Sequence, residues 1–349
     1  MKQVIKTVFL ENDSLFIIDQ RLLPQSEKTI KLSNESEVYE AIRTLAVRGA
    51  PAIGIAAAYG AYISLAVFSS MKDMVKFKEK ASAILEYIGS SRPTAYNLFY
   101  VIKRMRAILD AENFSGPKDI LAAWKKEALL IHEEDLIKSD EIAKHGSAVV
   151  KDKARILTHC NSGGLATGGN GTALSVIFKA HADGKGISVY ADETRPLLQG
   201  SRLTAWELEK TGIPYKVICD NMAAWVMAGN GIDLVIVGAD RIALNGDFAN
   251  KIGTYSLAVN AHYHGVPFYT AAPASTFDPD IEDGSLIPIE ERDREEVIRF
   301  RGMLSAPENS DAYNPAFDVT PHRLLTGIIT EFGIIYPPFR ENIQKVVKR

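Results

Sequence analysis

The sequence is poor in cysteine, and its positive and negative charges nearly balance. Its 349 residues include two cysteines, Cys160 and Cys219. Two are too few for a disulfide framework, so we expect a reducing, cytoplasmic setting. No Cys-x-x-Cys or zinc-type spacing occurs, and we expect no metal site. The formal net charge of −3 argues against a broad basic surface for nucleic acid or an anionic membrane.

The sequence also lacks a convincing membrane or targeting segment. The N-terminus carries Glu11 too early for a signal peptide. Residues 49–71 are uncharged and long enough to span a bilayer, but Ala, Gly, Ser and Tyr dominate them. We interpret this run as a buried helix and expect no membrane partner.

The first 150 residues read as mostly helical. Two short apolar runs around Asn12-Asp13 predict a β-hairpin. Helical patterns follow from Asn34, where Glu37 completes an analogue of a capping box. We expect helices near 36–46, 52–69, 72–88, 94–111 and 118–150.

After residue 150, short apolar strands alternate with helical segments. The predicted strands cover 155–159, 187–191, 215–218, 234–237 and 267–271. This alternation is typical of βαβ units and a parallel sheet. We expect the polar segment 273–315 to leave the sheet, and 317–336 to supply a helix and a strand. The sequence thus predicts an α/β protein, with a mostly helical domain over 1–150 that carries a small β element, and a Rossmann-like catalytic domain over 151–349.

Four consecutive predicted strands lead into a thiol or a carboxylate. The segments are His159-Cys160-Asn161, Asp192-Glu193-Thr194-Arg195, Cys219-Asp220-Asn221 and Gly238-Ala239-Asp240-Arg241. Ligands bind beyond the carboxyl ends of parallel strands, so these segments predict a site. Turn formation explains some of the Asp and Asn residues, and pairing with Arg241 is an alternative for Asp240. We interpret Cys219 as an ordinary cysteine.

A glycine-rich loop over 161–171 follows Cys160 and leads into a predicted helix. Such a loop presents amide groups where an anion is favoured, although a simple flexible turn is the alternative. The dinucleotide fingerprint G-x-G-x-x-G is absent, and Asn170 stands where a P-loop has lysine. A phosphomonoester therefore fits better than a nucleotide.

Two arginines precede prolines at predicted helix starts. They lie in Arg48-Gly49-Ala50-Pro51 and Ser91-Arg92-Pro93-Thr94. Either alone is equally well explained as a solvated surface arginine, but we interpret the two together as a phosphate clamp. Gln199, and Asn250-Lys251 in a predicted loop before a helix, add polar groups for sugar hydroxyls or phosphate oxygens.

Six short motifs occur in order along the chain. They are Arg-Gly-Ala-Pro-Ala-Ile-Gly (48–54), His-Cys-Asn-Ser-Gly (159–163), Glu-Thr-Arg-Pro (193–196), Gln-Gly (199–200), Gly-Ala-Asp-Arg (238–241) and Asn-Lys-Ile-Gly-Thr (250–254). This ordered set resembles the methylthioribose-1-phosphate isomerase family. The wider family includes ribose-1,5-bisphosphate isomerases and regulatory subunits of a translation initiation factor's exchange complex. The resemblance implies a helical domain on a Rossmann-like domain, a homodimer, no cofactor and a role in methionine salvage.

The resemblance also implies roles for individual residues. Asp240 would be the proton donor and Cys160 the second catalytic group. The implied substrate-binding residues are Arg48, Gly49, Ala50, Arg92, Gln199, Asn250 and Lys251. The implied reaction isomerises 5-methylthioribose 1-phosphate to 5-methylthioribulose 1-phosphate. An aspartate at its reference pKa of about 3.9 is ionised at neutral pH, so a donor role requires a desolvated setting.

Several alternatives stay open at this level. Hydrogen at C2 reaches C1 either as a proton removed by Cys160 or as a hydride. A ribose-1,5-bisphosphate isomerase differs in the group at C5. A non-catalytic subunit that senses sugar phosphates or nucleotides is the rival from another class, and the intact Cys160 and Asp240 argue against it.

Overall fold

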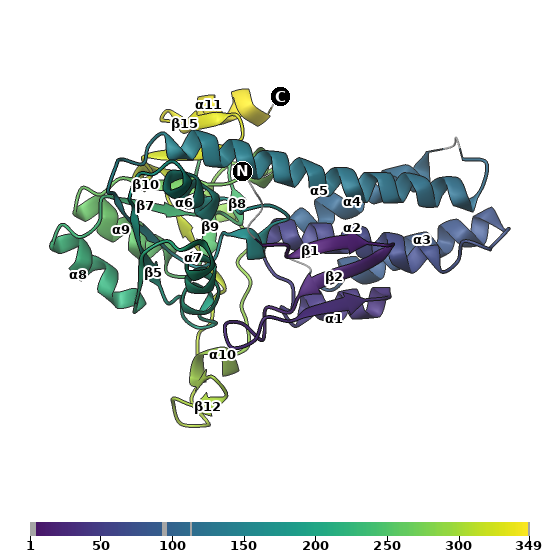
Figure 1. Cartoon of the computed structure of the whole chain (residues 1–349), viewed down its shortest axis with the longest axis horizontal. Coiled ribbons are helices and arrows are strands. Elements are labelled where there is room, and N and C mark those ends of the chain that lie inside the picture. Colours follow the sequence, from purple (N-terminus) through teal and green to yellow (C-terminus); the bar gives the residue numbers. More distant parts are fainter. Residues whose placement is uncertain (1–4, 93–95, 112–113, 348–349) are drawn as a thin grey trace. The chain divides into compact units, whose positions relative to one another are not determined.

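The computed structural model describes residues 5–92, 96–111 and 114–347, which fold into two compact units (Figure 1). The helical unit comprises residues 2–139 and 164–171. The sheet unit comprises residues 140–163 and 172–349. The segment 164–171 therefore belongs to the helical unit, although sheet-unit residues flank it in the sequence.

The helical unit is built around α2 (Ala50–Ala66), whose residues 52–65 are all buried. Neighbouring helices and the first two strands cover it on its different sides, so the uncharged run forms a core helix as predicted. Among the described helices, none is long and apolar enough to cross a membrane. The other elements are β1 (Val8–Glu11), β2 (Ser14–Ile18), β3 (Thr29–Leu32), α1 (Glu35–Arg43), α3 (Met74–Gly89), α4 (Tyr96–Asp110) and the first part of α5 (Pro117–Ser147).

The hairpin turn and the helix cap that the sequence predicts are both present in this unit. Asn12 and Asp13 both have positive φ and join β1 to β2 in a two-residue hairpin turn. The Asn34 side chain accepts the Glu37 N–H, and the Glu37 carboxylate accepts the Ser33 N–H. This reciprocal capping starts α1.

The sheet unit contains a seven-stranded sheet in the order β15-β14-β10-β7-β4-β5-β6. All neighbours are parallel except β15, which runs antiparallel to β14. Numbered along the chain, the six parallel strands have the doubly wound order 3-2-1-4-5-6. This confirms the predicted α/β class. The strands are β4 (Arg155–Thr158), β5 (Ser188–Asp192), β6 (Tyr215–Ile218), β7 (Leu234–Val237), β10 (Phe268–Ala271), β14 (Gly327–Thr330) and β15 (Gly333–Ile335).

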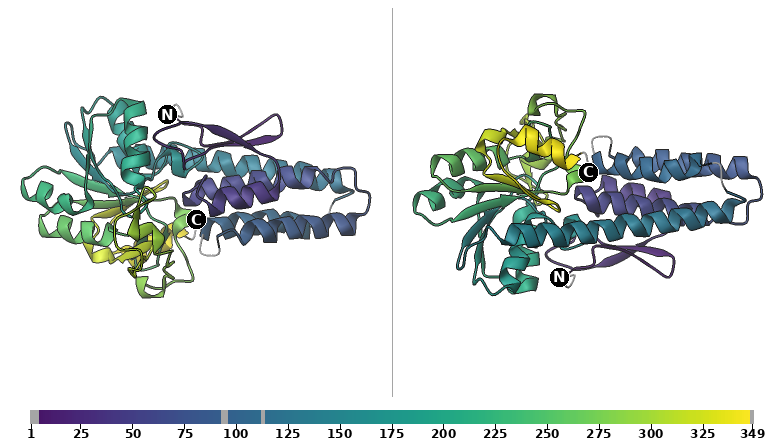
Figure 2. Two further views of the ribbon diagram at one scale, coloured as in Figure 1. Left: turned by 90° about the horizontal axis from the view of Figure 1, so that it is seen from below. Right: turned by 90° about the horizontal axis from the view of Figure 1, so that it is seen from above.

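Helices cover both faces of this sheet (Figure 2). Alternate strand residues point to opposite faces, so Leu157 and Val235 pack with α8, α9 and α11, whereas Ile156 and Leu234 pack with α6 and α7. The strands β7, β10 and β14 are buried along their whole length, as central strands with both faces covered are. The helices are α6 (Ala173–Ala182), α7 (Ala205–Thr211), α8 (Ala223–Ala228), α9 (Thr254–Tyr263) and α11 (Phe339–Val347).

Two predictions after residue 240 are wrong. Asn250 and Lys251 end strand β9 (Phe248–Lys251), which pairs with β8 (Arg241–Ile242) and β13 (Phe317–Thr320) in a second sheet. Residues 317–336 form β13, β14, β15 and one short turn at His322–Leu324, where a helix and a strand were expected. Their partners lie up to about seventy residues away in the chain, so local patterns could not identify them.

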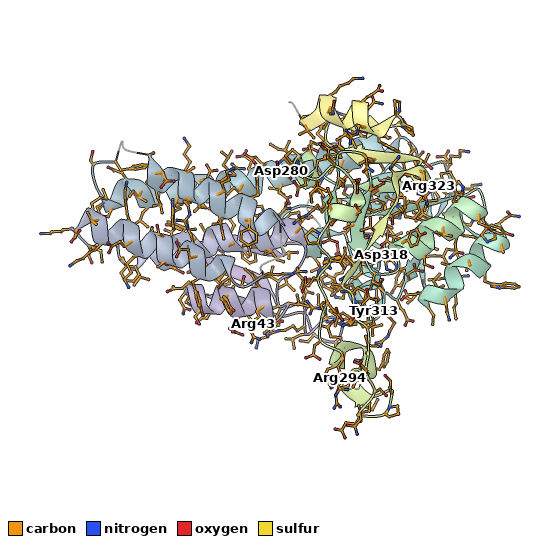
Figure 3. The ribbon with its side chains drawn as sticks, turned by 180° about the vertical axis from the view of Figure 1, so that it is seen from behind. Arg43, Asp280, Arg294, Tyr313, Asp318 and Arg323 are labelled. Carbon is orange, nitrogen blue, oxygen red and sulfur yellow. The ribbon has the colours of Figure 1, made fainter. Side chains whose placement is uncertain are left out.

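The segment between β10 and β13 leaves the main sheet as predicted. It contains α10 (Glu295–Ile298), β11 (Arg299–Phe300) and β12 (Met303–Leu304), which project from the rest of the sheet unit in Figure 1. Arg294 marks its position in Figure 3.

Candidate active site

Cys160 and Asp240 follow neighbouring strands of the main sheet. β4 leads to Cys160 and β7 leads to Asp240, and the two strands pair with Leu157 opposite Val235. From β4 the chain continues to β5 and β6 on one side, whereas β7, β10 and β14 lie on the other. The two residues therefore flank the point where the strand order reverses, which is where doubly wound sheets bind ligands.

The backbone at this point is closely packed. A Cβ atom at Gly238 would lie 2.4 Å from Ser162 Oγ, so the segment after β7 packs closely against the segment after β4. Behind it, the Asn161 side chain donates to the fully buried Glu207 at 2.8 Å. These contacts hold the Cys160 segment firmly.

Cys160 adopts the left-handed conformation, with φ of 62°. This conformation is uncommon for a residue with a Cβ atom and persists where the surroundings impose it. Here Thr194 Oγ1 accepts the Cys160 N–H at 2.8 Å, and Thr204 Oγ1 donates to the Cys160 carbonyl at 2.6 Å. Two threonine hydroxyl groups thus fix the backbone of the partly buried Cys160 in the left-handed conformation.

Asp240 is partly buried in the turn between β7 and β8. Its backbone N–H donates to the Ala249 carbonyl at 2.9 Å, which ties it to β9. The four residues of β7 are all buried, so an apolar strand leads to the carboxyl group as expected. Arg241 forms an ion pair with Asp278 at 3.3 Å.

The three other predicted site residues of the sheet unit are also placed by local contacts. Gln199 is 6% exposed, and within the described chain its side-chain oxygen has no hydrogen-bond partner. Asn250 is buried and donates to Thr254 Oγ1. Lys251 donates to the Ala316 carbonyl and lies over the Phe317 ring. The open acceptor of Gln199 suits a substrate hydroxyl.

Arg48, Gly49, Ala50 and Arg92 belong to the helical unit. Gly49 precedes α2 with φ of 90°, and a Cβ atom there would lie 2.4 Å from the Ala166 backbone. The backbone that follows Arg48 is therefore packed against the segment 164–171. Arg92 is partly buried after α3, whereas Pro93 and Thr94 of its motif lie outside the described residues.

Three amides of the glycine-rich loop, which was expected to present its N–H groups to an anion, bind side chains of the protein. The Gly168 N–H donates to Asp135 at 2.6 Å, the Gly169 N–H to Thr167 Oγ1 and the Asn170 N–H to Ser139 Oγ. Burial raises the pKa of Asp135, and the Gly168 amide opposes that effect. Side-chain oxygens already accept hydrogen bonds from these three amides. The amides therefore fix the loop in place and are not available to an anion.

A buried histidine–aspartate pair next to Cys160 was not identified from the sequence. His159 Nδ1 lies 2.9 Å from Asp192 Oδ2, and the two side chains are 1% and 2% exposed. Burial raises the pKa of Asp192 to about 6, although His159 opposes the shift. The signal was present in the sequence, since both residues end predicted strands, but their pairing is a tertiary contact across 33 residues.

Asp220 and Asp318 also lie close to this pair. Asp220 accepts the N–H groups of Thr194 and Arg195, both at 2.7 Å. Asp318 of β13, labelled in Figure 3, accepts the N–H groups of Gly253 and Tyr255 at the start of α9. Burial raises the pKa of Asp318 to about 6. One nitrogen or oxygen atom each of His159, Asp192 and Asp220 lies within 4.8 Å of the others. Asp192 Oδ2 faces His159 and Asp220 accepts two backbone N–H groups, whereas Asp192 Oδ1 has no hydrogen-bond partner among the described residues. We assign no metal to this group.

A family model and individual relatives place this chain in the same family. Residues 46–337 match the initiation factor 2 subunit family. The chain is 53% identical over 342 residues to a methylthioribose-1-phosphate isomerase of Thermoanaerobacter sp. (strain X514), covering 98% of this chain and 99% of that protein. It is 49% identical over 351 residues to a 5-deoxyribose 1-phosphate isomerase of Moorella thermoacetica, covering 99% of each.

A solved structure is similar in fold along nearly the whole chain. The crystal structure of 5-methylthioribose 1-phosphate isomerase from Pyrococcus horikoshii OT3 has a TM-score of 0.92 and 44% sequence identity. The match covers 98% of this chain and 96% of that one.

Proposed function

This chain belongs to the initiation factor 2 subunit family, and we propose that it is an aldose–ketose isomerase of methionine salvage. It converts 5-methylthioribose 1-phosphate to 5-methylthioribulose 1-phosphate. The observation that carries the proposal is the placement of Cys160 and Asp240 after two neighbouring strands, at the reversal point of a doubly wound sheet. The 53% identity to a protein of that name, over 98% of this chain, supports the same substrate.

Opening the sugar ring is the first step of the proposed mechanism. The phosphate on the anomeric oxygen prevents a free aldehyde from forming while the ring is closed. The bond between C1 and the ring oxygen must break with phosphate attached, and its electrons pass to that oxygen. We assign Asp240 as the acid that protonates it, because this carboxyl group follows a buried apolar strand.

Hydrogen transfer from C2 to C1 is the second step, and Cys160 is the assigned group. In one route its thiolate removes the C2 proton, giving an enol phosphate that is reprotonated at C1 as C2 becomes a carbonyl. In the other, the C2 hydrogen moves to C1 as a hydride. Deuterium at C2 distinguishes them, since wash-out into water supports the thiolate and full retention at C1 supports the hydride.

The remaining assigned residues bind the substrate. Arg48, Arg92 and Lys251 supply positive charge for the phosphate dianion, and the amides at Gly49 and Ala50 supply further donors. Gln199 and Asn250 face sugar hydroxyls in this proposal. Arg92→Gln should raise KM for the sugar phosphate more than it lowers kcat, as steady-state kinetics would show.

Asp240→Asn tests the acid directly. The amide has nearly the same shape but cannot donate a carboxyl proton, so kcat should fall by about 10²- to 10⁴-fold. Circular dichroism should show an unchanged fold. Wild-type turnover in this variant would refute the assignment.

A second substrate is favoured by one observation, the 49% identity to a 5-deoxyribose 1-phosphate isomerase. That sugar lacks the methylthio group but retains the reacting carbons. Side-by-side assays of both sugars and of ribose 1,5-bisphosphate would rank them. We expect the bisphosphate to be turned over least, because it places a second dianion where the proposed substrate has an apolar thioether.

We also propose a cytoplasmic homodimer. Large apolar side chains are exposed on the projecting segment (Met303 73%, Tyr313 79%) and on α8 and α9 (Trp225 82%, Tyr263 83%), and these surfaces are candidates for self-association. The mass measured by light scattering should be twice 38.3 kDa. Cell fractionation tests the location.

A further inference from the structure

His159 occupies an unusual position directly before Cys160. Its ring is buried at the end of β4, and each ring nitrogen lies 2.9 Å from an oxygen atom. Nδ1 faces Asp192 Oδ2, and Nε2 faces the backbone carbonyl of Ile252. A backbone carbonyl can only accept a hydrogen bond, and an ionised carboxylate has the same limitation.

The two acceptors determine how many protons the pair must hold. A neutral imidazole carries one N–H, so its other nitrogen would point a lone pair at an oxygen atom. Both contacts are hydrogen bonds if the pair holds two protons, either both on the ring with Asp192 ionised or one on Nε2 and one on Asp192. The pKa of Asp192 is about 6, so at pH 7 this carboxyl group is ionised and both protons are on the ring. Burial disfavours the imidazolium, but the hydrogen bond and charge of Asp192, with the charge of Asp220, outweigh it and raise the pKa of His159.

The histidine connects Cys160 to a segment distant in sequence. Ile252 lies between Lys251 and Gly253, in the turn from β9 to α9. Gly253 has φ of 103°, and a Cβ atom there would lie 2.8 Å from the His159 ring. The turn is therefore packed against the imidazole as well as hydrogen-bonded to it.

We propose that His159 is a positioning residue, whose doubly protonated ring bridges Asp192 and the Ile252 carbonyl and so holds the Asn250–Gly253 segment beside the strand end that carries Cys160. The effect of this bridge on catalysis rests on the proposed function. The bridge itself is a property of the fold and is measurable without turnover.

The charges around the ring determine its response to pH. Asp192 of β5, Asp220 after β6 and Asp318 of β13 are acidic groups near it, and Lys251 of β9 lies close to Asp318. Glu193 adds a further negative charge beside Asp192. Because the folded state binds the imidazolium proton more tightly than the unfolded state, the doubly protonated ring is lost as pH rises through the folded-state pKa of His159. The charge of Asp192 is lost in turn as pH falls below its pKa of about 6.

Nitrogen NMR of the wild-type protein, labelled at histidine, tests the protonation state. Both His159 nitrogens should have the chemical shifts of protonated ring nitrogens at pH 7, and His159→Gln identifies the signals. An unprotonated nitrogen at pH 7 would overturn the proposal. This measurement requires no substrate.

Two substitutions separate the two hydrogen bonds. The glutamine amide nitrogen of His159→Gln reaches about as far as Nε2, so it can keep the donor to Ile252. The asparagine nitrogen of His159→Asn reaches about as far as Nδ1 and keeps only the donor to Asp192. Exchange of the Gly253 amide, which Asp318 accepts, should stay within about threefold of wild type in the glutamine variant and rise about tenfold or more in the asparagine variant.

The loss of catalytic activity should also be larger in the asparagine variant than in the glutamine variant. The asparagine variant should lose about 10- to 100-fold in kcat/KM, mainly through KM, and the glutamine variant much less. His262→Gln, at an exposed position on α9, is the matched control and should match wild type. Equal amide exchange in both His159 variants would overturn the proposal, whether or not the wild-type protein isomerises the sugar. Absence of wild-type turnover would instead count against the proposed function alone.

Discussion

At the scale of single residues, the surroundings of one thiol are tightly fixed by hydrogen bonds. Cys160 has a left-handed backbone, and two threonine hydroxyl groups hold it there. His159 beside it bridges two acceptors in the protein interior. Sequence position predicted the importance of Cys160, but neither its backbone conformation nor the partner of His159 could be deduced, because both depend on chain segments that meet only after folding.

The first prediction at this scale concerns the thiol. Cys160→Ser should lower kcat by about 10²- to 10⁴-fold, since a hydroxyl group is a far weaker base and acid at neutral pH. Cys219→Ser is the matched control, at an exposed thiol whose pKa the charge of Glu193 raises. Steady-state kinetics should find the control within about twofold of wild type, as expected for an exposed substitution. A similar loss in both variants would mean that Cys160 has no special role.

The second prediction concerns the buried carboxyl group of Asp318. Its folded-state pKa is raised from 3.8 to about 6, so the folded protein binds this proton more tightly than the unfolded chain does. Proton binding by Asp318 therefore stabilises the folded state fully below about pH 4. This stabilisation falls by at most about 3 kcal/mol as the pH rises to about 6.

Asp318→Asn should remove this part of the pH dependence, because the amide does not titrate. Thermal unfolding measured from pH 4 to 7 tests it, with exposed Asp280→Asn as the control. An unchanged slope in the Asp318 variant would show that the carboxyl group is not perturbed in this way.

At the scale of elements, the βαβ pattern was predictable and the long-range pairings were not. The strands β6 and β7 begin and end where predicted. For β7 the reason is burial of all four residues, which requires a continuous apolar sequence. β9 and β13 were missed because each is short and polar at one end, and their pairing spans 65 residues or more between partners. The glycine-rich loop was recognised, but its amides turned out to bind Asp135, Thr167 and Ser139.

The close approach of the start of α2 to this loop gives a third prediction. Gly49→Ala places a methyl group 2.4 Å from the Ala166 backbone at a positive φ, so it should destabilise the protein by at least about 2 kcal/mol. Gly116→Ala is the control, since nothing lies within 4 Å of its added carbon. Denaturant unfolding should show the loss in the first variant only. Equal stability would mean that the loop moves away freely.

At the scale of the whole molecule, family membership and chemistry point to the same reaction. Full-length similarity to methylthioribose-1-phosphate isomerases fixes the family context, and the sheet places the assigned thiol and carboxyl group after adjacent strands. We retain the boundary near residue 150 as a proposal about independently folding domains. The compact units divide at residue 139 and assign 164–171 to the helical unit, so a fragment ending at 150 would lack part of that unit.

The most direct test is phosphorus NMR of the purified protein with 5-methylthioribose 1-phosphate. Wild-type protein alone should convert the anomeric phosphate signal into that of a primary phosphate ester, without added cofactor and without release of inorganic phosphate. Asp240→Asn and Cys160→Ser should leave the starting signal in place over the same period. An unchanged spectrum with folded wild-type protein, or full conversion by both variants, would contradict the assignment of an isomerase built on these two residues.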